Sequence, residues 1–280
     1  SRTGEKSEAF AKAQGFKGCC TDITELAKSP DINAVYIATP NSLHYAQSRL
    51  FLENGKHVLC EKPITASAKE YDALLKLADE KGVIYAEAIM SRHFKGRKIL
   101  FNALSEIGDI SAARIDYCQR SSRYDAFKGG EHINIFDMSL GAGTLTDLGV
   151  YCVYAAVDMF GMPQSVKASA AFFDNGADKS GSAIFEYDGF TAALSYSKAG
   201  QSAIGSEIIG DGGAVKIGSV SQYADISLVK NGKETKLSGF PERDEIMGDE
   251  AIKFADYIEK SKEFKADYNE VSTLTHNVHT

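Results

Sequence analysis

The stretch "HVLCEKPITAS", residues 57–67, decides the fold, because it takes an apolar segment directly into a charged pair and a proline. The segment from His57 to Cys60 has the composition of a strand that is buried on both faces. Proline restricts the backbone of the residue before it, so Lys62 is held at the carboxyl end of this strand instead of moving freely as a surface lysine would. A lysine fixed in this position indicates a catalytic or ligand-binding role.

Two further strands are expected on either side of this stretch. The apolar run Ala34 to Ala38 ends at a Thr-Pro turn, and a helix is expected after it, from about residue 42 to residue 54. A second helical pattern over residues 67–81 is stopped by a glycine and followed by "VIYAEA", residues 83–88. The order strand, helix, strand, helix, strand with short loops predicts an open α/β sheet of parallel strands.

Ligands of such sheets bind outside the carboxyl ends of the strands. Three consecutive strand ends carry polar groups here: Thr39-Pro40-Asn41, then Glu61-Lys62-Pro63, then Glu87. We therefore expect a cleft at this edge. The Thr-Pro-Asn segment also suits a simple turn and helix cap, and that alternative stays open. It explains the Glu-Lys pair less well, since neither charge is needed to make a turn.

A glycine-rich phosphate loop of the G-x-G-x-x-G kind follows no strand in the first half of the sequence. The opening "SRTGEKSEAFAKAQGF" looks like the end of a strand followed by a helix. We therefore expect residues 1–90 to form a Rossmann-type nucleotide-binding domain whose parallel sheet is incomplete at its N-terminus, with the first strand, loop and helix missing from the sequence.

From about residue 91 to residue 280 the pattern is that of an α+β domain. Amphipathic helices are expected near residues 97–108 and over residues 143–161, and alternating strands with hairpin turns at Asp188-Gly189 and Asn231-Gly232 follow. These strands predict an open antiparallel sheet with one face covered by a helix. Its other face is expected to be free for self-association as a homodimer or tetramer.

Composition narrows the classes of function. The 280 residues carry a net charge of −7, which argues against nucleic acid as the main partner because phosphate binding needs a basic face. No apolar run approaches the roughly 20 residues of a membrane span. Five cysteines without framework spacing predict reduced, buried thiols in a cytoplasmic protein. His276 and His279 have the spacing of metal ligands but no acid or thiol nearby in the sequence, so no metal is expected.

A second group of candidate residues lies in the helix expected over residues 143–161. Asp147 and Tyr151 are four residues apart, which puts them on one face about one turn apart. Alone, a D-x-x-x-Y pair is most often structural. Together with Lys62 it becomes more specific.

The combination resembles the Gfo/Idh/MocA family of nicotinamide-dependent sugar and cyclitol oxidoreductases. The resemblance rests on Glu61-Lys62-Pro63, on "ATPNSLH" at residues 38–44 and on "GAGTLTDLGVYCV" at residues 141–153. The variant "EAIMSR", residues 87–92, looks most like the dihydrodiol and xylose dehydrogenase branch. The resemblance covers almost the whole chain and includes the order of the two domains.

This resemblance implies a reaction and a set of roles. The family transfers a hydride between a nicotinamide cofactor and a hydroxyl or carbonyl group, here of a sugar, polyol or cyclic diol. Tyr151 would be the general acid/base, Lys62 would lower the pKa of that tyrosine and hold the substrate hydroxyl, and Asp147 would orient the substrate or the lysine. A catalytically silent sensor that binds the cofactor or a sugar is the alternative function.

The same resemblance implies the cofactor-binding residues. They are Ser1, Arg2, Thr39, Pro40, Asn41, His44 on the nicotinamide side of the cleft, Glu61, Lys62, Pro63 and Arg92. Arginine at the end of the second strand of such a domain accommodates a 2′-phosphate, so Arg2 favours NADP over NAD. The alternative is that Arg2 only stacks on adenine. The basic stretch "SRHFKGRK", residues 91–98, suits a phosphate or acidic-substrate site, but a solvated start of a helix explains it better.

Overall fold

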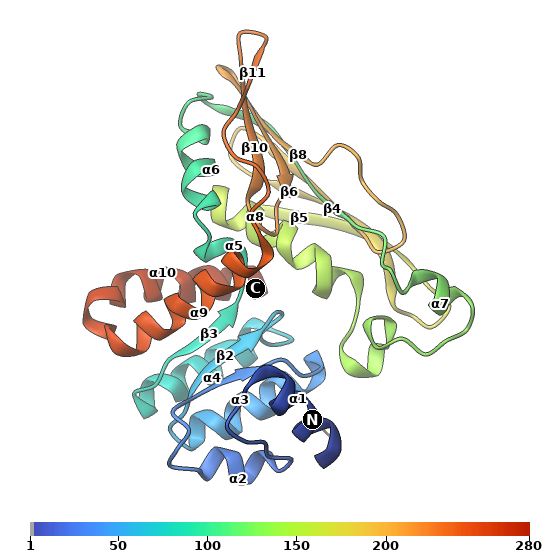
Figure 1. Ribbon diagram of the computed structural model, residues 1–280. Helices are drawn as coiled ribbons and strands as arrows, with labels where there is room; N and C mark the ends of the chain where they lie inside the picture. The colour runs from blue at the N-terminus through green and yellow to red at the C-terminus, as the bar shows by residue number, and fades with distance from the viewer. Residues whose placement is uncertain (1–2) are drawn as a thin grey trace.

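The computed structural model describes residues 3–280, apart from the side chains of residues 243–247 (Figure 1). Its first part is a parallel sheet in the order β1 (Ala34–Ile37), β2 (His57–Glu61), β3 (Tyr85–Ala88). Helix α3 (His44–Glu53) connects β1 to β2, and α4 (Ala68–Lys81) connects β2 to β3. This arrangement confirms the parallel α/β prediction.

Local sequence signals set the ends of α4. The Ser67 hydroxyl accepts a hydrogen bond from the Glu70 backbone N–H, and the Glu70 carboxylate accepts one from the Ala66 N–H, so polar side chains satisfy the first turn. Gly82 ends the helix with φ of 67°, a left-handed conformation that glycine adopts without strain. The helix buries Tyr71, Leu74 and Ala78 against α3 and the sheet, as its apolar spacing predicts.

The chain before β1 forms two helices, α1 (Gly4–Gln14) and α2 (Ile23–Lys28), which lie beside the parallel sheet in Figure 1. The Asp22 carboxylate caps α2 by accepting from the Thr24 and Glu25 N–H groups. Cys19 and Cys20 in the connecting segment are exposed, which corrects the expectation that all five thiols are buried; Cys60 and Cys152 are buried and Cys118 is intermediate.

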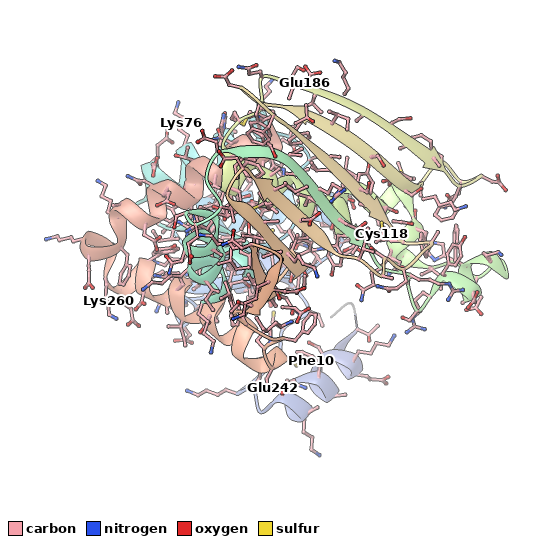
Figure 2. All side chains as sticks on the ribbon, turned by 90° about the horizontal axis from the view of Figure 1, so that it is seen from above. Phe10, Lys76, Cys118, Glu186, Glu242 and Lys260 are labelled. Carbon is pink, nitrogen blue, oxygen red and sulfur yellow. The ribbon has the colours of Figure 1, made fainter. Side chains whose placement is uncertain are left out.

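The second part is an eight-stranded sheet in the order β11-β10-β9-β8-β4-β7-β6-β5, seen from above in Figure 2 as a curved layer of neighbouring strands. Its strands are β4 (Ile110–Cys118), β5 (Ser165–Phe172), β6 (Asp178–Glu186), β7 (Thr191–Ser197), β8 (Ser206–Gly210), β9 (Gly213–Ser219), β10 (Ala224–Lys230) and β11 (Lys233–Lys236). The predicted hairpin turns at Asp188-Gly189 and Asn231-Gly232 are confirmed. One pair, β4 with β7, is parallel, so the sheet is mixed and mostly antiparallel.

One face of this sheet is covered by the helical segment that carries Asp147 and Tyr151. It begins as a π-helical turn, Leu145–Gly149, and continues as α8 (Val150–Phe160). The residues of α8 pack into the main core with inward side chains of the sheet. Gly149 lies where the Tyr196 ring of β7 crosses the helix, and an added Cβ would meet that ring at 2.9 Å. Glycine at this position therefore permits the helix to pack closely on β7.

The helical segment that contains α8 is unusually apolar. Among the described residues, Met138–Phe160 is the one helical stretch apolar and long enough to cross a membrane, which corrects the expectation that no run approaches that length; most of it is buried inside the protein. The core position of α8 accounts for that composition.

Helices α5 (Met90–His93) and α6 (Gly96–Leu104) connect β3 to β4 and so join the two parts. Helix α7 (Tyr124–Lys128) and the 3₁₀ turns Asn134–Phe136 and Met138–Leu140 follow β4, and the 3₁₀ turn Asn41–Leu43 precedes α3. The segment from residue 134 to residue 146 leaves the eight-stranded sheet and reaches toward the carboxyl ends of β1 and β2, which positions the candidate site.

The last two helices, α9 (Arg243–Glu259) and α10 (Ser261–His279), pack near the parallel sheet. Phe254 and Ile258 of α9 contact Leu59 of β2 and neighbouring residues of β3. The C-terminal helices therefore cover one face of the N-terminal sheet, although the sequence groups them with the second domain. The boundary at residue 90 stays a prediction.

Candidate active site

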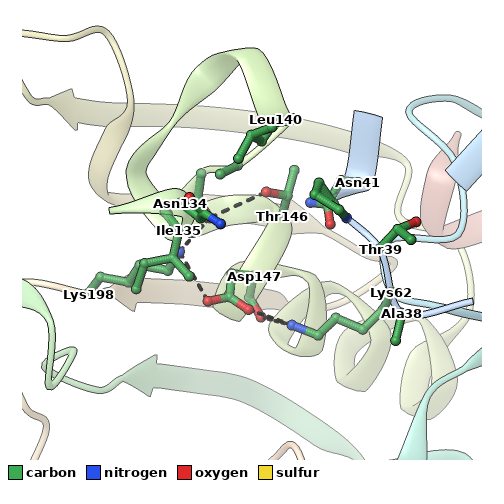
Figure 3. A pocket seen from close by; sticks show the side chains of 13 residues that line it. Ala38, Thr39, Asn41, Lys62, Asn134, Ile135, Leu140, Thr146, Asp147 and Lys198 are labelled. Atoms are coloured by element: carbon green, nitrogen blue, oxygen red, sulfur yellow. Dashed lines mark hydrogen bonds and ion pairs between the residues drawn. The ribbon is translucent and has the colours of Figure 1, made fainter. Parts of the chain in front are cut away.

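A cavity of about 300 Å³ lies between the carboxyl ends of β1 and β2 and the segment 134–146 (Figure 3). The residues that line it are Ala38, Thr39, Pro40, Asn41, Lys62, Asn134, Ile135, Leu140, Ala142, Gly143, Thr146, Asp147 and Lys198. The cleft predicted at the strand ends is thus present, and the second domain supplies its opposite wall.

Lys62 enters this cavity from the end of β2, where the chain turns into Pro63. Its Nζ lies 2.6 Å from Asp147 Oδ1 and 2.7 Å from the Asp147 backbone oxygen. A lysine ammonium has three N–H donors, so one of them has no oxygen acceptor among the described residues. The prediction that Lys62 and Asp147 meet is therefore correct, and Lys62 retains a donor for a ligand.

Glu87 holds the backbone of the turn that follows Lys62. Its carboxylate is buried and accepts a hydrogen bond of 2.8 Å from the Ile64 N–H, two residues after Lys62. The same carboxylate contacts the Tyr154 hydroxyl of α8 and His279 of α10. Glu87, expected at the cleft edge, lies beneath the turn instead and supports it.

Asp147 stands between two ammonium groups. Besides Lys62, Lys198 contacts its carboxylate, with Nζ 3.0 Å from Oδ2. Burial by itself acts to raise the pKa of Asp147, but the charges of Lys62 and Lys198 outweigh that effect and hold the pKa below its ordinary value. The carboxylate is therefore ionised at neutral pH and orients the lysine.

Lys198 is the residue of this group that the sequence did not reveal. It follows β7 directly, and its side chain is only 3% exposed. The one signal is a lysine at the end of an alternating strand that has no carboxylate within four residues along the chain. Its partners come from segments 51 to 63 residues away, which no local pattern encodes.

Tyr151 lies beside Lys62, but not in the way predicted. The Lys62 Nζ is 5.1 Å from the centre of the Tyr151 ring, and Tyr117 of β4 packs edge-on against the same ring. Burial first, and then the charges of Glu61 and other acidic neighbours, raise the pKa of Tyr151 well above its ordinary value. The expectation that Lys62 lowers this pKa is wrong, because burial and the neighbouring acidic groups dominate.

Glu61 lies next to Lys62 at the end of β2. It accepts hydrogen bonds from the Tyr36 hydroxyl and from the Lys62 backbone N–H. Glu250 of α9 is 8% exposed, and burial together with the charges of Glu61 and Glu87 raises its pKa to about 8. A second carboxyl group, absent from the predicted set, thus lies behind the strand ends.

Thr39, Pro40 and Asn41 line the cavity as predicted. The Thr39 hydroxyl donates to Gln47 Oε1 of α3 at 2.9 Å, and Asn41 Nδ2 donates to the Gly141 carbonyl at 3.0 Å. Asn41 therefore connects the first part of the chain to the wall of the second. Hydroxyl, amide and ammonium groups at the carboxyl edge of a parallel sheet fit the sugar and amide end of a nicotinamide cofactor.

His44 does not line the cavity, which corrects its expected position. The ring is fully buried, with Nδ1 2.8 Å from the Pro63 carbonyl oxygen and Nε2 2.9 Å from the Thr39 carbonyl oxygen. It thus links the two strand-end turns from behind. Pro63 lies next to Lys62 but faces a neighbouring cavity of about 320 Å³.

Arg92 does not face the cavity either. Its guanidinium pairs with Glu270 at 2.9 Å and Asp267 at 3.4 Å, both on α10. The side chain joins α5 to the C-terminal helices. Ser1 and Arg2 lie outside the described residues.

The two C-terminal histidines have separate partners. His276 contacts Asp72 of α4 at 2.7 Å, and His279 contacts Glu87. Burial acts to lower the pKa of His279, but Glu87 raises it above its ordinary value. No group of three or more potential metal ligands is found within residues 3–280, side chains of 243–247 apart.

Two family models match the chain. Residues 1–89 match the oxidoreductase family with an NAD-binding Rossmann fold, and residues 103–216 match the GFO/IDH/MocA C-terminal domain. Scyllo-inositol 2-dehydrogenase (NADP(+)) IolU of Bacillus subtilis is 37% identical over 262 residues, which are 94% of this chain and 80% of that protein. A trans-1,2-dihydrobenzene-1,2-diol dehydrogenase of Xenopus tropicalis is 31% identical over 83% of this chain and 69% of its own length.

Solved structures share the fold. KijD10, a 3-ketoreductase from Actinomadura kijaniata in complex with NADP and TDP-benzene, has a TM-score of 0.82 at 21% identity, covering 100% of this chain and 85% of that one. Levoglucosan dehydrogenase has a TM-score of 0.80 at 19% identity, covering 92% and 79%. The two family models and the 37% identical relative show that the chain belongs to the Gfo/Idh/MocA family of NAD(P)-dependent oxidoreductases.

Proposed function

We propose that this protein transfers a hydride between NADP and a CH–OH or carbonyl group of a cyclitol, sugar or cyclic diol. The observation that carries the proposal is the ammonium of Lys62, which points into the cavity with one N–H uncommitted. That donor suits the oxygen of the reacting carbon, which gains negative charge when a hydroxyl is deprotonated or a carbonyl accepts hydride.

Asp147 supports this role electrostatically. By accepting from Lys62 through both its carboxylate and its backbone oxygen, it fixes the direction of the remaining N–H. A donor that is already oriented needs no rearrangement when charge develops on the substrate oxygen. NADP, when bound, supplies or accepts the hydride.

Tyr151 is the proposed proton carrier. Its hydroxyl has no hydrogen-bond partner among the described residues, while its ring lies beside Lys62. Because its pKa is raised, the hydroxyl stays protonated through the neutral range and is suited to donate a proton to an alkoxide. This favours carbonyl reduction at neutral pH and alcohol oxidation at higher pH.

Cavity size and relatives guide the choice of substrate. A volume of about 300 Å³ is at the low end for ligand pockets and suits a single ring. The relatives described above are named for scyllo-inositol and for a dihydrobenzene diol, both six-membered rings with neighbouring hydroxyls. NADP is preferred in the proposal because the inositol dehydrogenase is named for it. Self-association through the open face of the sheet and a cytoplasmic location also stay proposals.

The test is a turnover assay of the full-length protein. Scyllo-inositol, myo-inositol, xylose and a cyclic trans-diol are offered with NADP and with NAD, and the absorbance of the reduced nicotinamide is followed. Turnover of at least one ring polyol, faster with NADP, is expected. Tight binding of NADPH with no absorbance change for any substrate would support the sensor alternative instead.

A further inference from the structure

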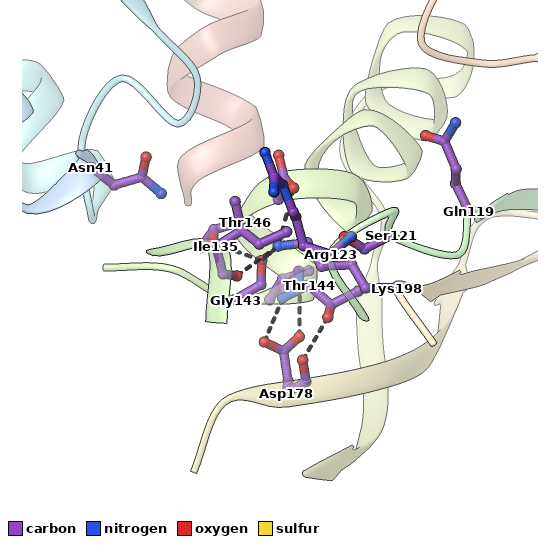
Figure 4. Close-up of polar contacts among 12 residues, drawn as sticks. Asn41, Gln119, Ser121, Arg123, Ile135, Gly143, Thr144, Thr146, Asp178 and Lys198 are labelled. Carbon is purple, nitrogen blue, oxygen red and sulfur yellow. Dashed lines mark hydrogen bonds and ion pairs between the residues drawn. The ribbon is translucent and has the colours of Figure 1, made fainter. Parts of the chain in front are cut away.

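Lys198 has a contact set that is complete without any ligand (Figure 4). Its Nζ lies 2.9 Å from the Ile135 carbonyl oxygen, 3.1 Å from the Gly143 carbonyl oxygen and 3.0 Å from Asp147 Oδ2. Three acceptors match the three N–H donors of an ammonium group. Lys198 therefore has no donor left for substrate, unlike Lys62.

The two carbonyl groups lie at the two ends of one loop. Residues 135–143, the wall loop, supply Ile135, Leu140, Ala142 and Gly143 to the lining of the cavity. Through Gly141 the loop also accepts the hydrogen bond from Asn41. A single buried ammonium group thus holds both ends of the wall loop and the carboxylate that orients Lys62.

We propose that Lys198 is a positioning residue that couples the wall loop to Asp147, so that the shape of the substrate cavity and the direction of Lys62 are set together. The inference rests on the proposed function for its effect on turnover, but the coupling itself is a property of the folded chain. Lys198 acts through Asp147 and the loop, without touching substrate.

The chemistry of the site requires a cation at this position. A neutral apolar side chain of the same length would leave the Ile135 carbonyl oxygen and Asp147 Oδ2 without the Lys198 donor, and the Gly143 carbonyl oxygen with the Thr146 hydroxyl in its place. Asp147 would then have Lys62 as its one cationic partner, and Lys62 could follow the carboxylate as it moved. Misplacement of a catalytic donor by about 1 Å can cost about 100-fold in rate.

The charged and titratable groups around Asp147 come from several elements. Lys62 follows β2 and Lys198 follows β7, and both cations lower the pKa of Asp147. The charge of Asp147 in turn raises the pKa of Tyr117 of β4 and of Tyr151 of α8. Asp178 at the start of β6 acts on Lys198 from the far side. When the Lys198 charge is removed, Lys62 is the one cationic partner left beside Asp147. The ionised form of Asp147 then becomes less favoured, so its pKa rises.

A matched control exists in the same loop region. The Asp178 carboxylate accepts hydrogen bonds from the Thr144 N–H at 2.6 Å and the Leu145 N–H at 2.7 Å, directly after the wall loop. It secures the same segment of chain without contacting the Asp147 carboxylate. Asp178→Asn should therefore loosen the wall loop and leave both cationic partners of Asp147, Lys62 and Lys198, in place.

The experiment compares Lys198→Gln, Lys198→Arg and Asp178→Asn in the full-length protein. Lys198→Gln keeps hydrogen-bond donors but loses the charge; we expect kcat to fall about 10- to 100-fold, with the acidic limb of the pH profile of kcat moved to higher pH. Lys198→Arg should recover part of the rate and return the acidic limb of the pH profile to its wild-type position. Asp178→Asn should raise KM without moving the limb. An unmoved limb in Lys198→Gln would overturn the proposal.

A second readout needs no turnover. Urea unfolding of wild type, Lys198→Gln, Asp147→Asn and the double variant forms a cycle whose interaction free energy reports the coupling of the two side chains. Because the pKa of Asp147 is lowered in the folded protein, this coupling should be present near neutral pH and vanish as the pH falls through that pKa. A cycle with no interaction at neutral pH would refute the inference, even if the protein proved to be a sensor without turnover.

Discussion

The ammonium group of Lys62 lies 2.6 Å from the carboxylate of Asp147, which joins the end of β2 to the π-helical turn that precedes α8. The two residues are 85 positions apart in the sequence. Their contact brings the strand ends of the first part of the chain against the cavity wall of the second. Function at this site therefore depends on how the two parts are held together.

Removal of the Lys62 ammonium should abolish most of the chemistry and spare the fold. In Lys62→Met we expect kcat to fall by about 100-fold or more, since one oriented donor to a developing oxyanion is lost. Steady-state kinetics and NADPH titration measure the two effects; cofactor affinity should change by only a few-fold. Lys216→Met, which removes a surface pair with Glu234, is the control and should leave kcat unchanged. Wild-type kcat in Lys62→Met would exclude its proposed role.

Tyr151→Phe tests the proton carrier. The substitution keeps the ring that packs on Tyr117 and Lys62 and removes only a hydroxyl without a partner among the described residues. Stability should stay within about 1 kcal/mol, while kcat should fall by roughly 100-fold or more because proton transfer loses its donor. Stopped-flow turnover and urea unfolding separate the two quantities. Activity within a few-fold of wild type would remove Tyr151 from that role.

Glu250 predicts a pH dependence of stability. Its pKa is raised to about 8 in the folded protein, so the folded state binds more protons than the unfolded state between the ordinary carboxyl pKa and pH 8. The wild type should lose stability as the pH rises through this window, by roughly 1.4 kcal/mol per pH unit at most. Glu250→Gln should remove that slope, as measured by urea unfolding from pH 4 to pH 9.

Glu186 provides a control of opposite sign. Hydrogen bonds from Lys167 and Ser165 lower the pKa of this exposed carboxyl group. Glu186 therefore stabilises the folded protein above the ordinary carboxyl pKa, and this stabilisation disappears in acid. Glu186→Gln should not change how the free energy of unfolding varies between pH 5 and pH 8. If the free energy of unfolding of Glu250→Gln varies with pH as that of the wild type does, burial of an uncompensated carboxyl group at this position is disproved.

Gly149 should tolerate no side chain. A Cβ there would come within 2.9 Å of both the Tyr196 ring and the Leu145 side chain. Overpacking of a core contact typically costs about 1–3 kcal/mol, so Gly149→Ala should lower the free energy of unfolding by that amount. Gly4→Ala is the matched control, because no atom lies within 4 Å of its added Cβ. Equal stability of both variants would show that α8 can shift away from the sheet at no cost.

The sequence by itself determined the local elements and one edge of the site. The proline after Lys62, the cap at Ser67 and the stop at Gly82 act within a few residues, so their effect on β2 and α4 follows from backbone sterics and hydrogen bonding alone. The position of Lys62 at a strand end follows in the same way. Its partner Asp147 was predicted only with the help of the family resemblance.

The tertiary structure decided the rest. Lys198 acquires its role from acceptors in three distant segments, and burial of Tyr151 among carboxylates reverses the expected direction of its pKa shift. His44 bonds two backbone carbonyl groups behind the cavity, and Arg92 pairs with acidic residues of α10 instead of facing it. Desolvation and charge balance depend on which side chains surround a group in space, and a local pattern cannot encode contacts made 50 or more residues away.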